Sequence, residues 1–156
     1  MEWARPARED DRAACSELLA LALGETRGIR GGVALAGTAS PDELLQRWMA
    51  GRPRDATVYV GGLHDVVVGV AAATATSSMR QQGTVLSGRI ECCYVEQGAR
   101  GVGVGTALME SMVTWCAQRG CVDIDALALP GDRLTKQRLE AAGFSARLLV
   151  LSRPLS

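Results

Sequence analysis

The sequence predicts an α/β fold in which helices flank a mixed sheet. Three observations predict it. Apolar residues recur at helical spacing in the N-terminal third of the chain. From Ala56 the apolar period becomes that of strands, and three strand-like segments follow one another as in an antiparallel meander. Beyond Arg89 strands and helices alternate, which is typical of helices that cross over a sheet.

The N-terminal third predicts a short strand and two helices. Glu2–Arg5 has the pattern of a strand, and Asp10–Leu23 places apolar residues at helical spacing. Gly24–Gly37 holds five glycines, so we expect a loop there. The second helix starts at a capping box on Ser40, with proline at the first helical position, and ends at Gly51 and Pro53.

The middle of the chain predicts an antiparallel meander. Thr57–Val60 reads as a strand, Gly61–Asp65 as a turn and Val66–Thr76 as the returning strand of a hairpin. Ser77–Gly83 is polar and is expected to be flexible. Arg89–Val95 predicts the third strand.

The C-terminal half alternates strands with helices. A glycine-rich loop over 97–105 leads into an amphipathic helix, and Val122–Leu129 predicts the next strand. Asp132 is the expected N-cap of a last helix that runs through Ala142. Phe144–Leu151 predicts a final strand.

Composition excludes several classes of function. The 156 residues fit one domain, 1–156, and 17 basic side chains balance 17 acidic ones, which leaves no electrostatic footprint for nucleic acid or an anionic membrane. The N-terminus has no signal-peptide core, and the longest apolar stretch, Val66–Ala73, is too short to span a bilayer. With five cysteines, no C-x-x-C pair and one histidine, we expect reduced thiols, no metal site and a cytoplasmic location.

The segment from Val95 to Leu108 carries the strongest functional signal. Its glycines let the backbone approach a ligand, and the helix that starts there points the positive end of its dipole at the loop, so the loop suits a phosphate or pyrophosphate. It is not a P-loop, because Val104 occupies the lysine position, and it lacks the third glycine of a dinucleotide fingerprint. The alternative is a glycine-rich turn without a ligand.

Arg100-x-x-Gly103-x-Gly105, directly after a strand that ends at Val95, resembles the R/Q-x-x-G-x-G/A loop of the GCN5-related N-acetyltransferases, the GNAT family. The resemblance also covers the preceding hairpin, the strand after the helix, and the last helix with its Gly143-Phe144 ending. It implies a mixed, mostly antiparallel sheet with a splayed central pair of strands, flanked by about four helices.

The resemblance implies that acetyl-CoA is the co-substrate. The loop amides would bind its pyrophosphate, the strand before the loop would hold the pantetheine arm, and the amide of Cys93 would polarise the thioester carbonyl. Asp132 either contacts that arm or is a plain N-cap. The implied binding residues are Cys93, Tyr94, Val95, Arg100, Gly101, Val102, Gly103, Val104, Gly105, Thr106 and Asp132.

Direct transfer also needs a base for the acceptor amine. Glu91 lies two residues before Cys93, so a regular strand would place both on one side. In several family members an acidic residue on this strand is the general base. The resemblance therefore makes Glu91 and Cys93 the catalytic candidates. The alternative is a structural role, in which Glu91 pairs with Arg89 or a distant arginine.

The family's usual general acid is missing. Leu139 stands at the position of the family's tyrosine, and leucine cannot donate a proton. Tyr94, Thr135 or a water molecule would then protonate the leaving thiolate, or the thiolate leaves unassisted, or the protein is not a catalyst.

The sequence thus predicts an acyl-CoA-dependent N-acyltransferase that transfers acetyl to a small amine or a peptide N-terminus. The acceptor would lie between the first two helices, their Gly24–Gly37 connection and the strand end near Glu91. The alternative is a GNAT-like module that binds acyl-CoA or a partner without turnover. Homodimers are common in this family, and acceptor identity and acyl-chain length stay open.

Overall fold

The computed structural model describes residues 1–50 and 55–155. One five-stranded sheet organises them, and the spatial order of its strands is their order in the chain. Neighbouring strands are antiparallel up to the fourth, and the fourth and fifth are parallel, which confirms the mixed, mostly antiparallel sheet. The strands are β1 (Glu2–Pro6), β2 (Ala56–Leu63), β3 (Val66–Arg80), β4 (Gly83–Val95) and β5 (Cys121–Ala126).

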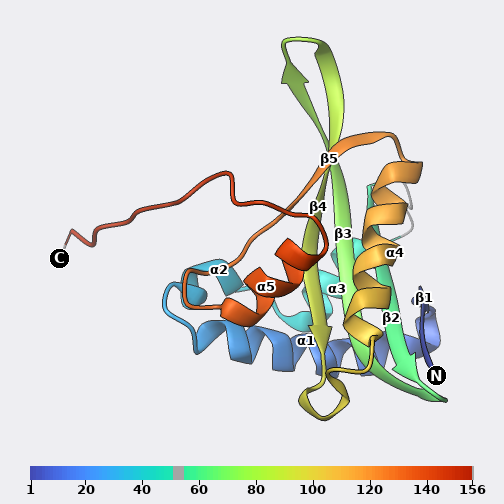
Figure 1. Ribbon diagram of the computed structural model, residues 1–156. Helices are drawn as coiled ribbons and strands as arrows, with labels where there is room; N and C mark the ends of the chain where they lie inside the picture. Colours follow the sequence, from blue (N-terminus) through green and yellow to red (C-terminus); the bar gives the residue numbers. More distant parts are fainter. Residues whose placement is uncertain (51–54, 156) are drawn as a thin grey trace.

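Helices cover both faces of this sheet (Figure 1). The first face carries α1 (Arg12–Arg27) and α3 (Pro41–Met49), with α2 (Gly32–Ala36) beside α1. The second face carries α4 (Val104–Gln118) and α5 (Arg133–Ala141). Two single-turn helices, η1 (Glu9–Asp11) and η2 (Gln97–Ala99), precede α1 and α4.

Each face of the sheet has its own apolar cluster, because successive strand residues point to opposite sides. Along β3, Val70 and Ala72 pack under α1 and α3, whereas Ala71 and Ala73 pack under α4. All four side chains are fully buried. The centre of the sheet is therefore covered twice, and the small alanines let the helix layers approach it closely.

The prediction of a loop over Gly24–Gly37 was wrong, because α1 continues through Arg27 and α2 lies inside the segment. The glycines serve turns and close contacts. Gly31 has a φ of +82°, and a β-carbon on Gly32 would lie 1.6 Å from the carbonyl oxygen of Thr26. No side chain fits there, so the glycine-rich composition reflects tight packing of α2 against α1.

The predicted turn at Gly61–Asp65 is shorter than expected, since β2 continues through Leu63. Gly61 lies in the strand because the side chain of Val104 occupies the space that a β-carbon would need, at 2.7 Å. The serine cap of α3 is confirmed, with the Ser40 hydroxyl accepting the Glu43 amide at 3.1 Å. The predicted helix end at Gly51 and Pro53 lies outside the described residues.

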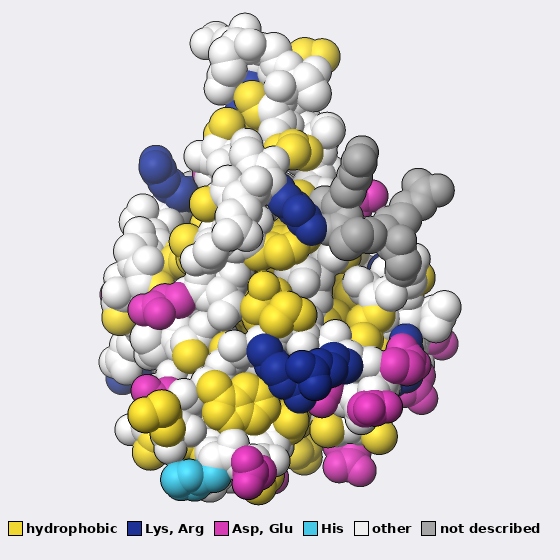
Figure 2. Space-filling view, turned by 90° about the vertical axis from the view of Figure 1, so that its right-hand side faces the viewer, with side chains coloured by type: hydrophobic (Ala, Val, Ile, Leu, Met, Phe, Trp, Pro, Cys, Tyr) yellow, Lys and Arg dark blue, Asp and Glu magenta, His cyan; other side chains and the backbone are white. Residues whose placement is uncertain are grey.

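Ser77–Gly83, expected to be flexible, forms the tip of a long β3–β4 hairpin instead. The pairing runs from Thr76 opposite Ser87 to Arg80 opposite Gly83, whose φ of +108° suits the turn. The hairpin projects beyond the helices in Figures 1 and 2. Arg80 also donates to Asp123 of β5 at 2.8 Å, so a cross-strand ion pair stabilises it.

The predicted final strand over Phe144–Leu151 is wrong for this structure. The chain is extended there, but it pairs with no described strand. At the end of α5, Gly143 has a φ of +94° and the Phe144 amide donates to the carbonyl of Leu139 at 2.9 Å. This cap turns the chain away from the sheet.

Candidate functional site

The site begins where β4 and β5 separate. Their parallel pairing runs from Leu86 opposite Cys121 to Ile90 opposite Ala126, where β5 ends and the chain leaves toward α5. β4 continues to Val95 with β3 as its strand neighbour. The last residues of β4 therefore present one backbone edge to the gap, which confirms the splayed pair. The predicted residues Cys93, Tyr94 and Val95 lie on this edge.

The glycine loop follows this edge and opens α4. Gly101 and Gly103 have φ values of +85° and +96°, and Gly103 is the N-cap of α4. A glycine cap has no side chain to accept the first amides of the helix, those of Val104, Gly105 and Thr106. A β-carbon on Gly103 would lie 3.3 Å from Glu2, whereas Gly101 has open space around it. Amides at the positive end of a helix dipole are suited to a phosphate.

Val104 contributes to this loop through its backbone. Its side chain is 1% exposed and packs into the cluster under α4. Val102 and Thr106 are exposed beside it. A β-carbon added to Gly105 would lie 3.6 Å from the side chain of Val95, an ordinary van der Waals contact. The loop is thus anchored by one buried side chain while its amides stay near the surface.

Arg100 ties the loop to α1 through a residue that the sequence reasoning missed. Its Nε donates to the carbonyl of Val95 at 2.7 Å, and its Nη2 pairs with Glu25 at 3.1 Å. The hydroxyl of Tyr94 donates to the same carboxylate at 3.3 Å, and the Arg100 guanidinium lies 5.3 Å from the centre of its ring. Burial and the nearby Glu25 raise the pKa of Tyr94. Glu25 stands 75 residues before Arg100, inside the segment predicted to be a loop, and nothing local marks it.

A β-bulge reorients Glu91. Ala72 pairs with Cys92 and Ala73 with Ile90, so Glu91 is the extra residue of β4. Its carboxylate accepts the hydroxyl of Thr74 at 2.8 Å and faces the side of α3. Cys93 packs against the cluster on the opposite face. The expectation that Glu91 and Cys93 share one side was wrong, because the bulge interrupts the alternation.

Glu91 borders a groove of about 410 Å³ between α3 and the sheet. Two carboxylates, a tryptophan ring and a row of small strand residues form its walls. The lining residues are Leu44, Arg47, Trp48, Asp55, Ala56, Thr74, Ala75, Thr76 and Glu91.

The cysteines of β4 are not activated nucleophiles. Burial raises the pKa of Cys93 to about 11, although Arg138 acts in the opposite direction. Burial also raises the pKa of Cys92. Both thiols are therefore protonated at neutral pH, and thiolate chemistry is disfavoured. What Cys93 offers to a ligand in the gap is its backbone.

The last helix supplies no proton donor at the family's position. Leu139 is 8% exposed and packs in the cluster under α4. The carboxylate of Asp132 caps α5 by accepting the amide of Thr135 at 3.1 Å. This bond agrees with the expectation that Asp132 is the N-cap of the last helix. Tyr94 lies on the opposite face of the sheet from Leu139, because it packs in the cluster under α1 and α3. It therefore does not replace the missing tyrosine from the same side.

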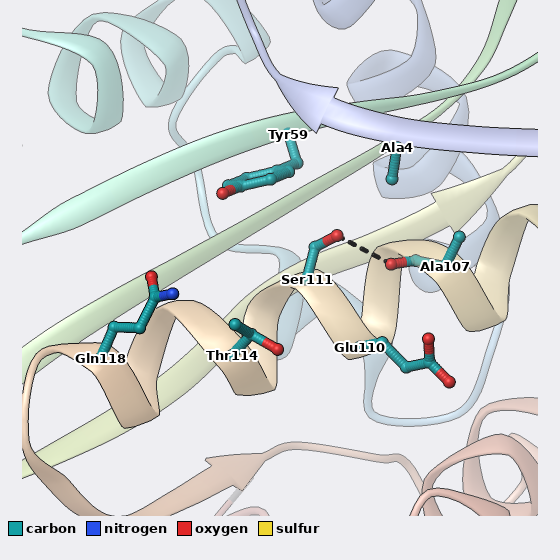
Figure 3. A pocket seen from close by; sticks show the side chains of 7 residues that line it. All are labelled: Ala4, Tyr59, Ala107, Glu110, Ser111, Thr114 and Gln118. Atoms are coloured by element: carbon teal, nitrogen blue, oxygen red, sulfur yellow. Dashed lines mark hydrogen bonds between the residues drawn. The ribbon is translucent and has the colours of Figure 1, made fainter.

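A second groove, of about 400 Å³, lies between α4 and strands β1 and β2 (Figure 3). Ser111, Thr114 and Gln118 line it from α4, and Tyr59 and Ala4 face them from the sheet. The Ser111 hydroxyl donates to the carbonyl of Ala107, a bond that satisfies it within the helix. This groove is remote from β4 and β5 and contains no predicted site residue.

The described residues hold neither a metal-binding cluster nor a membrane-spanning helix. No group of three metal-binding side chains occurs in that part of the chain. None of its helices combines the length and apolar character needed to cross a bilayer. His64, the one histidine, is exposed in the β2–β3 turn and lies at the lower edge of the surface in Figure 2.

Comparisons with known proteins match this arrangement. The sequence profile of the acetyltransferase (GNAT) family matches residues 25–136. A Trypanosoma brucei acetyltransferase superposes with a TM-score of 0.69 at 21% identity, covering 99% of this chain and 100% of the other. Glucosamine-6-phosphate N-acetyltransferase from Arabidopsis thaliana gives 0.68 at 16% identity, with 100% and 99% covered. A transcriptional regulator from Bacillus halodurans C-125 gives 0.76 at 21% identity, with 99% and 100% covered. No curated protein matches the sequence.

Proposed function

Because the chain belongs to the acetyltransferase (GNAT) family, we propose that it transfers an acetyl group from acetyl-CoA to a primary amine by direct attack. One observation carries the proposal. The glycine loop at the start of α4 lies directly after the edge of β4 that β5 leaves unpaired. This arrangement supports the proposal, because a long nucleotide thioester needs a phosphate site next to a backbone edge.

We assign the loop from Arg100 to Thr106 to the pyrophosphate and the edge from Cys93 to Val95 to the pantetheine arm. The support is geometric, because Gly103 leaves the amides of the first helical turn without a side-chain cap. Arg100 acts mainly by bracing the loop against Val95 and Glu25. Asp132 serves α5 as its cap and lies outside this assignment.

Acetyl-CoA supplies an activated acyl group. The amide of Cys93 polarises the thioester carbonyl, and Glu91 accepts the proton that the amine releases on forming the new bond to carbon. Because the bulge turns Glu91 toward the α3 side, the amine approaches from the groove while the thioester lies in the gap. The departing sulfur takes its proton from water, since Leu139 has none to give.

The acceptor groove favours a cationic amine. Of the residues that the structure describes, Glu91 and Asp55 bring two carboxylates to its lining and Arg47 brings one guanidinium. A protonated small amine or a protonated peptide N-terminus complements this charge on binding, and it releases its first proton to water before the neutral amine attacks. We also propose that residues 1–156 act as one domain in the cytoplasm, since both apolar clusters share one sheet and the five cysteines are free thiols.

The proposal is tested by release of free thiol from acetyl-CoA in the presence of small amines, polyamines and peptides. A productive acceptor must give acetylated product by mass spectrometry in proportion to the thiol released. Thiol release without product is hydrolysis and contradicts the proposal.

The second candidate is a GNAT-like module that binds acyl-CoA without turnover. The observation that favours it is Leu139, which packs in the core where the family places its acid. Calorimetric binding of acetyl-CoA together with no product from any acceptor class would favour this candidate over the enzyme.

A further inference from the structure

Two cysteines, Cys116 and Cys121, stand on either side of the turn that ends α4. Cys116 lies in the last turn of the helix, and Cys121 is the first residue of β5 (Figure 1). Between them Gly120 has a φ of +80°, and its amide donates to the carbonyl of Ala117 at 3.0 Å. In such a glycine cap, the second residue after the C-cap often contacts the third residue before it. With Arg119 as the C-cap, these two residues are Cys121 and Cys116.

Both cysteine side chains pack on the α4 face of the sheet. Cys116 is 2% exposed, and Cys121 is half-buried against the same apolar cluster. The sulfur of Cys116 rests on Gly88 of β4, where an added β-carbon would lie 2.5 Å from it. Close by on β4, Leu86 pairs with Cys121 at the start of β5. The helix end, the turn and the sheet therefore hold the two thiols next to each other.

The Cys121 side chain is close enough to affect the ionisation of Cys116. Burial, and after it the neighbouring Cys121, raises the pKa of Cys116 to about 11, although Arg119 acts in the opposite direction. Cys116 is therefore a protonated thiol at neutral pH. Cys121 is the more exposed of the two, so a small reagent in solution reaches it first.

We propose that Cys116 and Cys121 form a reversible oxidation site, which a small-molecule disulfide such as glutathione disulfide converts to an intramolecular disulfide bond. The Cys121 thiolate attacks one sulfur of the reagent, breaks its S–S bond and releases one thiol. Cys116 then gives its proton to water and attacks the Cys121 sulfur, which releases the second thiol. The protein loses two electrons and two protons, and the reagent gains them as two thiols.

This inference does not depend on acetyl transfer. The Gly103 loop opens α4, whereas the two thiols lie at the other end of the helix. At 1.5 Å per residue the distance between these ends is about 20 Å. Oxidation therefore leaves the loop free, and its test needs neither CoA nor an acceptor.

The other three cysteines are placed less favourably for this chemistry. Cys15 is fully buried, so a reagent cannot reach it. The thiol of Cys92 packs on the opposite face of the sheet and donates to the carbonyl of Val70 at 3.9 Å. Cys93 shares the α4 face but follows Gly88 by five residues on β4, which is roughly 16 Å along a strand. A disulfide needs α-carbons within about 7 Å of each other.

The test is equilibration of the folded full chain with mixtures of reduced and oxidised glutathione. Free thiols are then blocked with iodoacetamide, and the chain is digested with trypsin. Arg119 lies between the two cysteines, so the disulfide joins two separate peptides, 101–119 and 120–133. We expect this linked pair to be the main disulfide product, and dithiothreitol to remove it. In urea its formation should be about tenfold less favourable or weaker still, because no turn then holds the thiols together.

Two variants assign the product to this pair. Cys121→Ser keeps the size of the side chain and should abolish the linked peptides. Cys15→Ala is the matched control, because it removes a thiol from the other cluster and should leave the linked peptides unchanged. The proposal is overturned if folded wild-type protein forms no linked pair, or if Cys121 stops at the mixed disulfide with glutathione. It is also overturned if the urea-unfolded chain forms the pair as readily as the folded one.

Discussion

At the scale of single residues, Glu91 depends on a backbone irregularity for its position. The bulge opposite Ala72 and Ala73 turns the Glu91 side chain to the α3 side, where Thr74 donates to it. An acid in a regular strand would have faced the cluster under α4, among apolar side chains. The bulge thus gives Glu91 access to the groove beside α3, where we propose that the amine binds. Bulges often reorient a side chain in this way next to active sites.

Glu91→Gln should therefore reduce kcat by about 10²–10⁴-fold while leaving acetyl-CoA affinity nearly unchanged, because the amide keeps the shape but cannot accept the proton. Glu96→Gln is the matched control, since Glu96 is an exposed carboxylate just beyond β4 and outside the groove lining. Equal turnover of the Glu91 variant and wild type would return Glu91 to a structural role.

Leu139 gives a prediction for how the leaving sulfur is protonated in the proposed reaction. Leu139→Tyr puts a phenol where the family has its acid, and Leu139→Phe adds the same ring without the hydroxyl. We expect thiol release to be up to about tenfold faster in the Tyr variant than in the Phe variant, since grafted acids are imperfectly aligned.

Leu139 is 8% exposed, so an unpaired phenol at this position should cost about 1–3 kcal/mol of stability. Thermal melts must accompany the kinetics for this reason. If the Leu139→Tyr and Leu139→Phe variants both fold, bind CoA and release thiol at the same rate, the phenol hydroxyl has no effect. Protonation of the sulfur then does not limit turnover.

At the scale of elements, the signals for helix starts could be read locally from the sequence, whereas contacts between distant residues could not. The cap at Ser40 and the strand–loop–helix around Gly103 follow from neighbouring residues, and both are present. The glycines of Gly24–Gly37 led to the wrong prediction of a loop, because glycine occurs both in loops and where two backbones pack closely. Which of the two applies depends on the residues that pack against the glycine in the folded protein. The Glu25 contact with Arg100 and the bulge at Glu91 arise from partners distant in sequence.

The glycine loop at the N-terminus of α4 gives a prediction about CoA binding. Acetyl-CoA and free CoA should both raise the melting temperature of the wild-type protein, because a ligand that binds only the folded state stabilises it. Gly103→Glu should abolish this shift, since its side chain would crowd Glu2 and bring negative charge to the first amides of α4.

Gly83→Glu is the matched control for the loop. Gly83 also has a positive φ, +108°, but stands at the hairpin tip with nothing within 4 Å. It bears the same strain and charge and should keep the full shift. A shift retained in the Gly103 variant, or absent in wild type at saturating CoA, would remove the loop from the binding site.

At the scale of the whole molecule, the edge of the sheet and the first helix layer are joined by one ion pair. Arg5 of β1 donates to both carboxylate oxygens of Asp11, at 2.7 and 3.1 Å, just before α1. The amide of Arg8 adds a third bond, at 2.7 Å. Asp11 is 8% exposed and is the buried charged residue of the described chain. The hydrogen bond from Arg5 lowers the pKa of Asp11 despite its burial.

A lowered pKa makes the pair's contribution to stability depend on pH with a definite sign. Unfolding exposes a carboxyl of ordinary pKa, about 3.9. The contribution is complete above that value and is lost as the pH falls through the lower pKa of the folded protein. Asp11→Asn should therefore cost about 1–3 kcal/mol at neutral pH, and its difference from wild type should shrink below about pH 4.

Urea unfolding across a pH series measures this difference directly. Glu9→Gln is the control, because Glu9 is an exposed carboxylate paired with Arg12 on the surface, and exposed pairs contribute little. If the difference between Asp11→Asn and wild type were constant from neutral to acid pH, the cost would lie in packing and not in the charge. A difference that vanishes in acid locates the link between β1 and α1 in this carboxylate, and with it the attachment of the sheet edge to the first helix layer.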